Sequence, residues 1–234
     1  MNKFKIFCKT MPYCFKKKVL EAAIMSSLLY GCETWITNNL KEVEKVYISA
    51  VKSILGVRET TRNDTVLLEA GMLSLRNLVI KRTSGFLKKE LCADQTDDTP
   101  LRKIFTICKA KETGGYRFLS QTQNQAEQNS NTVEQEFQKQ TSSKALTYKS
   151  INPSLSMHAA YTTPDYVDER ERLVFTRFRL SSHHLKIETG RWARIEVEKR
   201  VCDCGLGIQD ELHVLLKCGK TEEVRGRFGI SVGD

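Results

Sequence analysis

Aromatic residues and long apolar runs are scarce in this sequence of 234 residues. Aromatic side chains make up 8% of the chain and apolar residues 40%, so we expect a buried core together with a long polar segment. The most apolar early stretch, 19–32, is short and includes Glu21, which argues against a membrane span. The basic N-terminal segment has no continuous apolar stretch of the kind that marks a secretory signal peptide.

The sequence also lacks the regular cysteine spacing of small secreted domains. Four of its eight cysteines, Cys8, Cys14, Cys32 and Cys92, are scattered through the N-terminal part of the chain. We therefore expect a reducing compartment, the nucleus or the cytoplasm, and no secretion. In such a compartment a cluster of cysteine and histidine indicates a metal site in preference to a disulfide.

Acidic residues are fewer than basic ones. The chain has 37 Lys and Arg and 28 Asp and Glu, which gives a net charge of +9. A surplus of this size favours polyanionic partners, so we expect nucleic acid as a partner and no membrane. The segment 1–18 carries six lysines and no acid, which fits either phosphate contact or a solvated terminus. Over 19–91 we find no acid–base pair, nucleophile–histidine pair or glycine-rich phosphate loop. Glu33 and Glu69 are interpreted as caps or surface partners.

Apolar residues recur at three- and four-residue spacing through 19–91, which predicts an N-terminal bundle of helices. A capping residue or a glycine marks most of the expected ends. The helices are expected at 17–36, 40–55, 65–70 and after Ser74.

Polar residues then take over, and 120–143 is almost entirely Gln, Asn, Ser, Thr and Glu. Such a segment buries too little apolar surface to offset its ordering entropy. We predict a linker over 92–158, disordered or loosely helical in part. A coiled-coil contact through Val133 and Phe137 is the alternative.

A second structured part is expected over 159–227, followed by a tail at 228–234. Asp165 is expected to cap a helix over 166–180. The stretch 170–200 carries nine Lys and Arg against four Glu. Basic residues interleaved with aromatic rings can follow phosphates while a ring stacks on a base, although an amphipathic helix with a buried Trp gives the same pattern. The candidate nucleic-acid-binding residues are Arg170, Arg172, Arg177, Arg179, Lys186, Arg191, Trp192, Arg194, Lys199 and Arg200.

The segment 200–218 holds the most specific pattern, with Cys202, Cys204, His213 and Cys218 in the spacing Cys-x-Cys-x8-His-x4-Cys. Three thiolates and one imidazole are the ligands of a closed, tetrahedral, structural Zn²⁺ site, which leaves no open position for catalysis. A short helix is expected from Gln209 or Asp210, with His213 on it and Cys218 at its end. The single residue between the first two cysteines is a shorter gap than usual, and ordinary reduced thiols are the alternative. His183 and His184 are substitute ligands or a polar turn.

The fold class expected from these elements is mainly α, with an N-terminal helical bundle, a polar disordered linker, and a basic helix plus a small zinc knuckle. Two blocks carry a family resemblance. SSLLYGCETW, continuing through ILGVRETTRNDTVLLEAGMLSL, resembles the region after the polymerase core of non-LTR retrotransposon reverse transcriptases of the Jockey/RTE-like kind. RFRLSSHHLKIETGRW followed by RVCDCGLGIQDELHVLLKC is similar to the C-terminal segment of the same proteins, with its Cys-Cys-His-Cys knuckle.

The resemblance implies a protein of an element that copies its RNA into DNA at a nicked chromosomal target. Its basic segment and knuckle would help to grip RNA or DNA. The family's polymerase uses paired aspartates in an aromatic-x-Asp-Asp motif, and Asp97-Asp98 does not match it. We therefore expect a non-catalytic, nucleic-acid-binding fragment and no enzyme activity. The alternatives are a protein-interaction module and a piece of an RNA-directed DNA polymerase that acts only with a palm.

Overall fold

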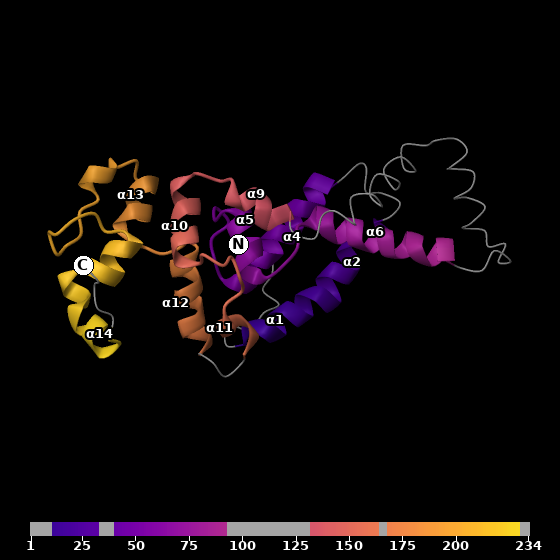
Figure 1. The fold of residues 1–234 in the computed structure, drawn as a ribbon, viewed down its shortest axis with the longest axis horizontal. Coiled ribbons are helices and arrows are strands. Elements are labelled where there is room, and N and C mark those ends of the chain that lie inside the picture. The colour runs from indigo at the N-terminus through magenta and orange to yellow at the C-terminus, as the bar shows by residue number, and fades with distance from the viewer. Residues whose placement is uncertain (1–10, 33–39, 93–131, 164–167, 230–234) are drawn as a thin grey trace.

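The computed structural model describes residues 11–32, 40–92, 132–163 and 168–229. Across these ranges the chain is mainly α-helical and forms no strand, as predicted, and one isolated antiparallel bridge joins Val201 to Ile208. Figure 1 shows an elongated molecule, with α6 (Leu75–Cys92) toward one end. At the other end, the Cys/His segment (200–218) lies beside α13 (Lys186–Trp192) and α14 (Glu222–Arg227). Helices α10 and α12 lie between the N-terminal helices and that segment.

The helix predicted over 17–36 begins instead at Tyr13, inside the basic segment 1–18, where Lys16 is buried and not solvated; its last helical piece ends at Leu28, and 33–36 lie outside the described residues. The bounds predicted for α4 are confirmed, and α5 ends before Gly71 as expected. Ser74 caps α6, since its Oγ accepts a hydrogen bond from the Asn77 amide at 3.2 Å. The elements are α1 (Tyr13–Val19), the π-helical η1 (Leu20–Met25), α2 (Ser26–Leu28), α4 (Leu40–Leu55), α5 (Asn63–Ala70) and α6 (Leu75–Cys92).

The core of this part forms where the apolar faces of α1, η1, α4 and α5 meet. Leu20, Ile54 and Leu55 are fully buried there, as the apolar stripe of α4 requires. The phenol of Tyr13 donates to the Ala70 carbonyl at 3.0 Å, and that of Tyr47 donates to the Leu73 carbonyl at 2.7 Å. These buried aromatic rings therefore keep their polar ends satisfied.

The linker prediction needs correction over 132–158, where the chain forms α9 (Thr132–Gln138) and α10 (Ser143–Ile151). Phe137 and Tyr148 are buried in the common core, with ring centroids 5.6 Å apart in an edge-on arrangement. The sequence contains few apolar residues here, but those few dock onto a surface that α5 already provides. The rest of the predicted linker, 93–131, lies outside the described residues.

The C-terminal part begins with α11 (Ala159–Thr162) and α12 (Glu169–Arg179). Asp168 caps α12 by accepting from the Arg170 amide at 3.1 Å, so this helix starts later than predicted, while Asp165 lies outside the described residues. The remaining elements are α13 (Lys186–Trp192), η2 (Val197–Lys199), η3 (His213–Lys217), η4 (Gly219–Thr221) and α14 (Glu222–Arg227).

A buried carboxylate joins the two parts of the chain. Glu69 of α5 has no exposed surface, so its interpretation as a cap or surface partner is wrong. It accepts from Arg179 Nε at 2.6 Å and Nη2 at 3.1 Å, and from the phenols of Tyr148 and Tyr161 at 2.7 and 2.6 Å. Four helices, α5, α10, α11 and α12, therefore share one polar centre.

A second buried group repeats this arrangement nearby. Glu169 accepts from Arg172 Nε at 2.7 Å and Nη2 at 2.9 Å, and it also pairs with Lys16 of α1. All three side chains are almost completely buried. The N-terminal helices and α12 thus belong to one packed body. The sequence did not predict whether these two parts contact each other.

Candidate metal centre

A tight hairpin brings the first two cysteines of the Cys/His segment together. The Cys202 amide donates to the Gly207 carbonyl at 2.7 Å, and the Gly205 amide donates to the Cys202 carbonyl at 2.9 Å. Gly205 has a φ of 78°, a left-handed conformation that glycine adopts without steric cost. The turn therefore closes within a few residues and returns the chain toward Gln209.

The short helix after the hairpin places the other two ligands. Asp210 Oδ1 accepts from the His213 amide at 2.7 Å, which confirms Asp210 as a start of this helix. The Cys218 amide then donates to the His213 carbonyl at 2.7 Å, an i to i+5 bond of the π-helical turn η3. Residues five apart lie on different faces of an α-helix, and the wider π turn brings them onto the same side.

The four candidate ligand atoms converge, and they all lie within 4.8 Å of one another. The Sγ atoms of Cys202 and Cys218 are 3.7 Å apart, and Cys204 Sγ lies 3.1 Å from His213 Nε2. Zn–S bonds of about 2.3 Å in a tetrahedron place two sulfurs roughly 3.8 Å apart. The donor set therefore fits a metal ion, and the short gap between Cys202 and Cys204 does not prevent convergence.

Hydrogen bonds within the cluster already favour one thiolate. The Cys204 amide lowers the pKa of Cys202 to about 6, and the Gln209 side-chain amide lies 3.7 Å from the same sulfur. The Leu206 amide also donates to Cys204 Sγ, but burial and the neighbouring sulfurs outweigh it and raise the pKa of Cys204. Because a metal binds thiolates, the ion would supply the positive charge that the remaining thiols need to ionise.

The two histidines suggested as substitute ligands are engaged elsewhere. His183 Nε2 lies 2.8 Å from Glu211 Oε1, and its Nδ1 accepts from the Leu185 amide at 3.2 Å. The His184 ring meets the indole of Trp192 edge-on at 6.4 Å. Neither belongs to the group of converging ligands, so that alternative is wrong for this fold.

Seven of the ten candidate nucleic-acid-binding side chains reach the surface. Arg191 and Lys186 are half-buried, and each forms an ion pair, with Glu188 at 2.7 Å and with Asp203 respectively. Lys199 pairs with Glu196 on the surface at 2.8 Å. The four other exposed side chains are Arg170, Arg177, Trp192 and Arg194.

Three of the ten are buried, and the expectation that they contact nucleic acid is corrected. Arg172 and Arg179 neutralise the buried carboxylates of Glu169 and Glu69. Arg200 donates to the Ile187 carbonyl at 2.8 Å and to the Ile195 carbonyl, and so attaches the knuckle to α13. The guanidinium groups of these three arginines donate hydrogen bonds to acceptors inside the protein. The pattern of basic residues in the sequence does not show where those acceptors lie.

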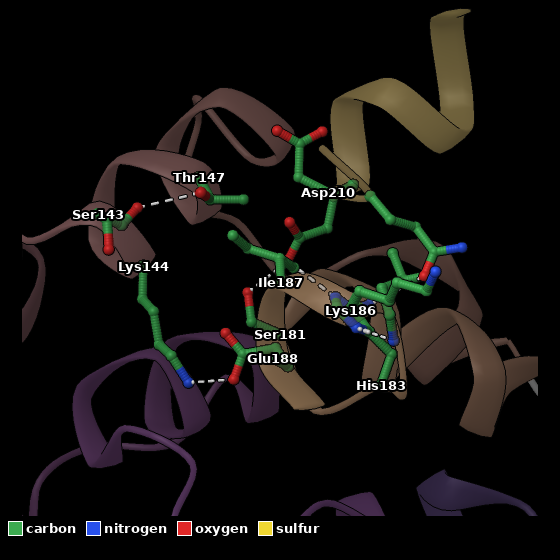
Figure 2. Close-up of polar contacts among 12 residues, drawn as sticks. Ser143, Lys144, Thr147, Ser181, His183, Lys186, Ile187, Glu188 and Asp210 are labelled. Atoms are coloured by element: carbon green, nitrogen blue, oxygen red, sulfur yellow. Dashed lines mark hydrogen bonds and ion pairs between the residues drawn. The ribbon is translucent and has the colours of Figure 1, made fainter. Parts of the chain in front are cut away.

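A mixed-charge contact connects α10 to α13 next to the knuckle. Glu188 accepts from Lys144 of α10 and from Arg191, both at 2.7 Å, and the first pair is visible in Figure 2. A cavity of about 330 Å³ opens here. Its acids are paired with protein cations or hydrogen-bonded within the chain, so we interpret these contacts as structural.

Sequence reasoning missed Arg58, which follows α4. Its guanidinium carbon lies 3.8 Å from the centre of the Trp192 ring, and its Nη2 donates to the His183 carbonyl at 2.8 Å. No local pattern marks a single arginine in a loop as the neighbour of a tryptophan far along the chain. Only the packing of the loop against the C-terminal part brings the two together.

None of the comparisons with family models, curated proteins and solved structures found a match for this chain. Among the helices of the described residues, none combines the length and the apolarity needed to cross a bilayer.

Proposed function

We propose that this chain is a non-catalytic nucleic-acid-binding protein whose C-terminal knuckle is held by a structural Zn²⁺ ion. The observation that carries the proposal is the convergence of Cys202, Cys204, His213 and Cys218, preceded in the chain by a segment with exposed arginines and one exposed tryptophan. Such small zinc-stabilised modules present cations and a ring on a rigid base. The proposal assigns the chain to the nucleus or the cytoplasm.

Zinc is supported over other metals by the donor set and the shape of the site. Soft thiolates select Zn²⁺ over Mg²⁺ or Ca²⁺, and four protein ligands leave no place for a reactive water. Metal analysis of the purified protein should give one zinc per chain. Cys204→Ser and His213→Ala should each reduce that ratio sharply, while Cys14→Ser, a cysteine outside the cluster, should not. A wild-type ratio far below one would remove the metal from the proposal.

Phosphate contact is supported by the exposed arginines of α12 and of the turn after α13. Binding of this kind weakens with salt, with a slope near 0.9 per neutralised phosphate on duplex DNA. The triple variant Arg170→Gln, Arg177→Gln, Arg194→Gln should lower the affinity for a labelled 20-base-pair duplex and reduce the salt slope by about 2–3. None of these three side chains is buried, so the fold should persist.

A matched control changes the same charge elsewhere on the molecule. Lys41, Lys45 and Lys81 are exposed on α4 and α6, and their triple Gln variant has the same net charge as the arginine variant. We expect it to bind nearly as the wild type does. Equal losses in the two variants would indicate non-specific attraction, and unchanged affinity in the arginine variant would refute the proposed surface.

The resemblance to non-LTR retrotransposon reverse transcriptases supports the same proposal, because it implies a basic segment and knuckle that grip nucleic acid. The matching blocks do not include the family's polymerase motif. We accordingly propose no polymerase activity for this chain alone. A primer-extension assay with an RNA template tests this, and incorporation by the isolated chain would contradict it.

A second candidate, a protein-interaction module, is favoured by exposed apolar side chains on the knuckle. Leu206 is 71% exposed and Phe228 is 76% exposed, and Leu212, Leu215 and Val224 are also exposed. Several large apolar side chains exposed within one short part of the chain are a feature of interaction surfaces. Binding to a protein partner that resists both high salt and nuclease treatment would favour this candidate over nucleic-acid binding.

A further inference from the structure

Trp192 lies at the surface where three separate segments of the chain meet. It ends α13, and the loop after α4 supplies Arg58 against one face of its ring. That loop is fixed in place, because the Arg58 amide donates to Ser182 Oγ at 3.1 Å and the Arg58 guanidinium donates to the His183 carbonyl. The position of the indole is thus determined by tertiary contacts and not by α13 alone.

Part of the Trp192 side chain remains open to solvent beside its two ring contacts. Arg58 stacks at 3.8 Å on one side, and His184 meets the ring nearly perpendicular, at 89°. Trp192 is nevertheless 48% exposed, so about half of its surface is still open to solvent and to a further contact. A cation stacked on one face of an aromatic ring is attracted by the ring and helps to hold it in place.

Two further arginines belong to the same part of the chain's surface as Arg58 and Trp192. Arg177 Nε donates to the Gly56 carbonyl at 2.9 Å, which holds it beside the Arg58 loop. Burial lowers the pKa of Arg58, and the charges of Glu188 and Arg177 act on it in opposite directions, as expected for neighbours. Arg194, exposed just after α13, adds another positive charge. An exposed tryptophan, Arg58 against its ring and Arg177 beside the Arg58 loop are therefore brought together by the fold.

We propose that Trp192, supported by Arg58, is a stacking site for one base of a single-stranded nucleic acid. The inference rests on the proposed nucleic-acid binding and adds a preference to it. A base presents its flat face only when it is unstacked, so an open indole favours single strands, whereas arginines contact the phosphates of any strand. The proposal assigns the neighbouring phosphates to Arg177 and Arg194, whose side chains are exposed.

The test measures binding of oligo(dT), oligo(U) and a duplex of equal length, by fluorescence anisotropy at fixed salt. Trp192→Ala should weaken single-strand binding by about tenfold, the typical effect of losing one stacked base, and leave duplex binding within about twofold. Trp192→Phe should recover most of the loss, since it keeps a stacking ring. Comparison of the two oligomers shows whether RNA or DNA is preferred.

Phe15 provides a matched control. It is 49% exposed and has the Lys18 ammonium 5.8 Å from its ring centre, so it is also an exposed ring beside a cation. Phe15→Ala should change neither affinity. A direct readout is available because the chain has two tryptophans: in a Trp35→Phe background, stacking should quench the remaining Trp192 fluorescence on single strands and not on duplex.

The outcomes separate this inference from the proposed function. Loss confined to single strands, with rescue by Phe, supports the stacking site. Unchanged single-strand affinity in Trp192→Ala overturns it, and so does equal loss on both substrates, which would indicate damage to the fold. If the arginine triple variant still lowers binding in those cases, the proposed function stands without the stacking site. If the wild type binds neither substrate, both fail.

Discussion

Replacing Glu69 by Gln should destabilise the protein strongly, although the two side chains have nearly the same shape. The carboxylate receives four hydrogen bonds in a site without solvent exposure. An amide keeps one acceptor oxygen and turns an NH₂ group toward donors. A tyrosine hydroxyl can rotate to accept, but the Arg179 guanidinium can only donate. The variant would thus leave a buried cation without its counter-charge.

The expected cost is about 3–5 kcal/mol, the usual penalty for breaking a buried ion pair from one side. With a urea m-value near 2 kcal/mol/M, this moves the unfolding midpoint, followed by far-UV circular dichroism, down by about 2 M. Since domains of this kind are stable by only about 5–15 kcal/mol, the loss should be plainly visible. Glu44→Gln, an exposed residue of α4, is the isosteric control and should stay within about 0.5 kcal/mol of the wild type.

A double-mutant cycle then separates the ion pair from its surroundings. Arg179→Met alone leaves the Glu69 carboxylate buried with only the tyrosine donors, so it should also be costly. Combined with Glu69→Gln, it removes both charges, and the double variant should cost at least about 1 kcal/mol less than the sum of the single variants. Strict additivity, or a cost below about 1 kcal/mol for Glu69→Gln, would refute the assignment of this group as the centre of the fold.

Three further predictions follow from other contacts. Gly190→Ala should lower the free energy of unfolding by about 1–2 kcal/mol in urea, because a Cβ at this position would lie 2.7 Å from the hydrogen-bonded Arg200 side chain. The control Gly226→Ala in α14, which has open space around it, should be neutral or stabilising. A larger loss of stability in Gly226→Ala than in Gly190→Ala would contradict the packing. Burial raises the pKa of four tyrosines far above 10, those of Tyr13, Tyr47, Tyr148 and Tyr161. Their contribution to the free energy of unfolding is therefore complete below about pH 10, the pKa of a tyrosine in the unfolded chain. Above that pH the unfolded state ionises, and the protein loses up to about 1.4 kcal/mol of stability per tyrosine per pH unit. Absorbance at 295 nm should show these phenols ionising together with alkaline unfolding, and ionisation of all of them near pH 10 in a folded protein would disprove it. Removal of metal by a chelator should speed amide hydrogen exchange in 201–218 while α4 stays protected, and unchanged exchange would show that no metal orders the knuckle.

Local patterns were sufficient for the elements that fold by local rules. The stripe of α4 recurs without interruption, so its bounds could be predicted to the residue. The Cys/His spacing likewise predicted which side chains converge, because a hairpin and one short helix close the site within a single segment. Cap residues such as Ser74 and Asp210 act on their own helix and are visible for that reason.

Long-range pairing explains what the sequence did not reveal. Whether a basic residue faces solvent or a buried carboxylate depends on a partner far away in the chain, as Arg179 and Glu69 show. The helix α10 was missed because its apolar content is low, and its stability comes from Tyr148 docking into a core formed elsewhere. The turn η3 was also not foreseen, although the five-residue interval between His213 and Cys218 is the spacing that a π turn requires.

The shared centre at Glu69 has a consequence for how this chain can change over time. A segment that folds by itself can be exchanged between proteins by recombination and keep its stability. Here α5 contributes the negative charge, and α10, α11 and α12 contribute the groups that satisfy it. If an unrelated segment were joined after α6, the Glu69 carboxylate would be buried without a cation or hydrogen-bond donors. We therefore expect the two parts of this chain to be inherited together and their residues around Glu69 to change together.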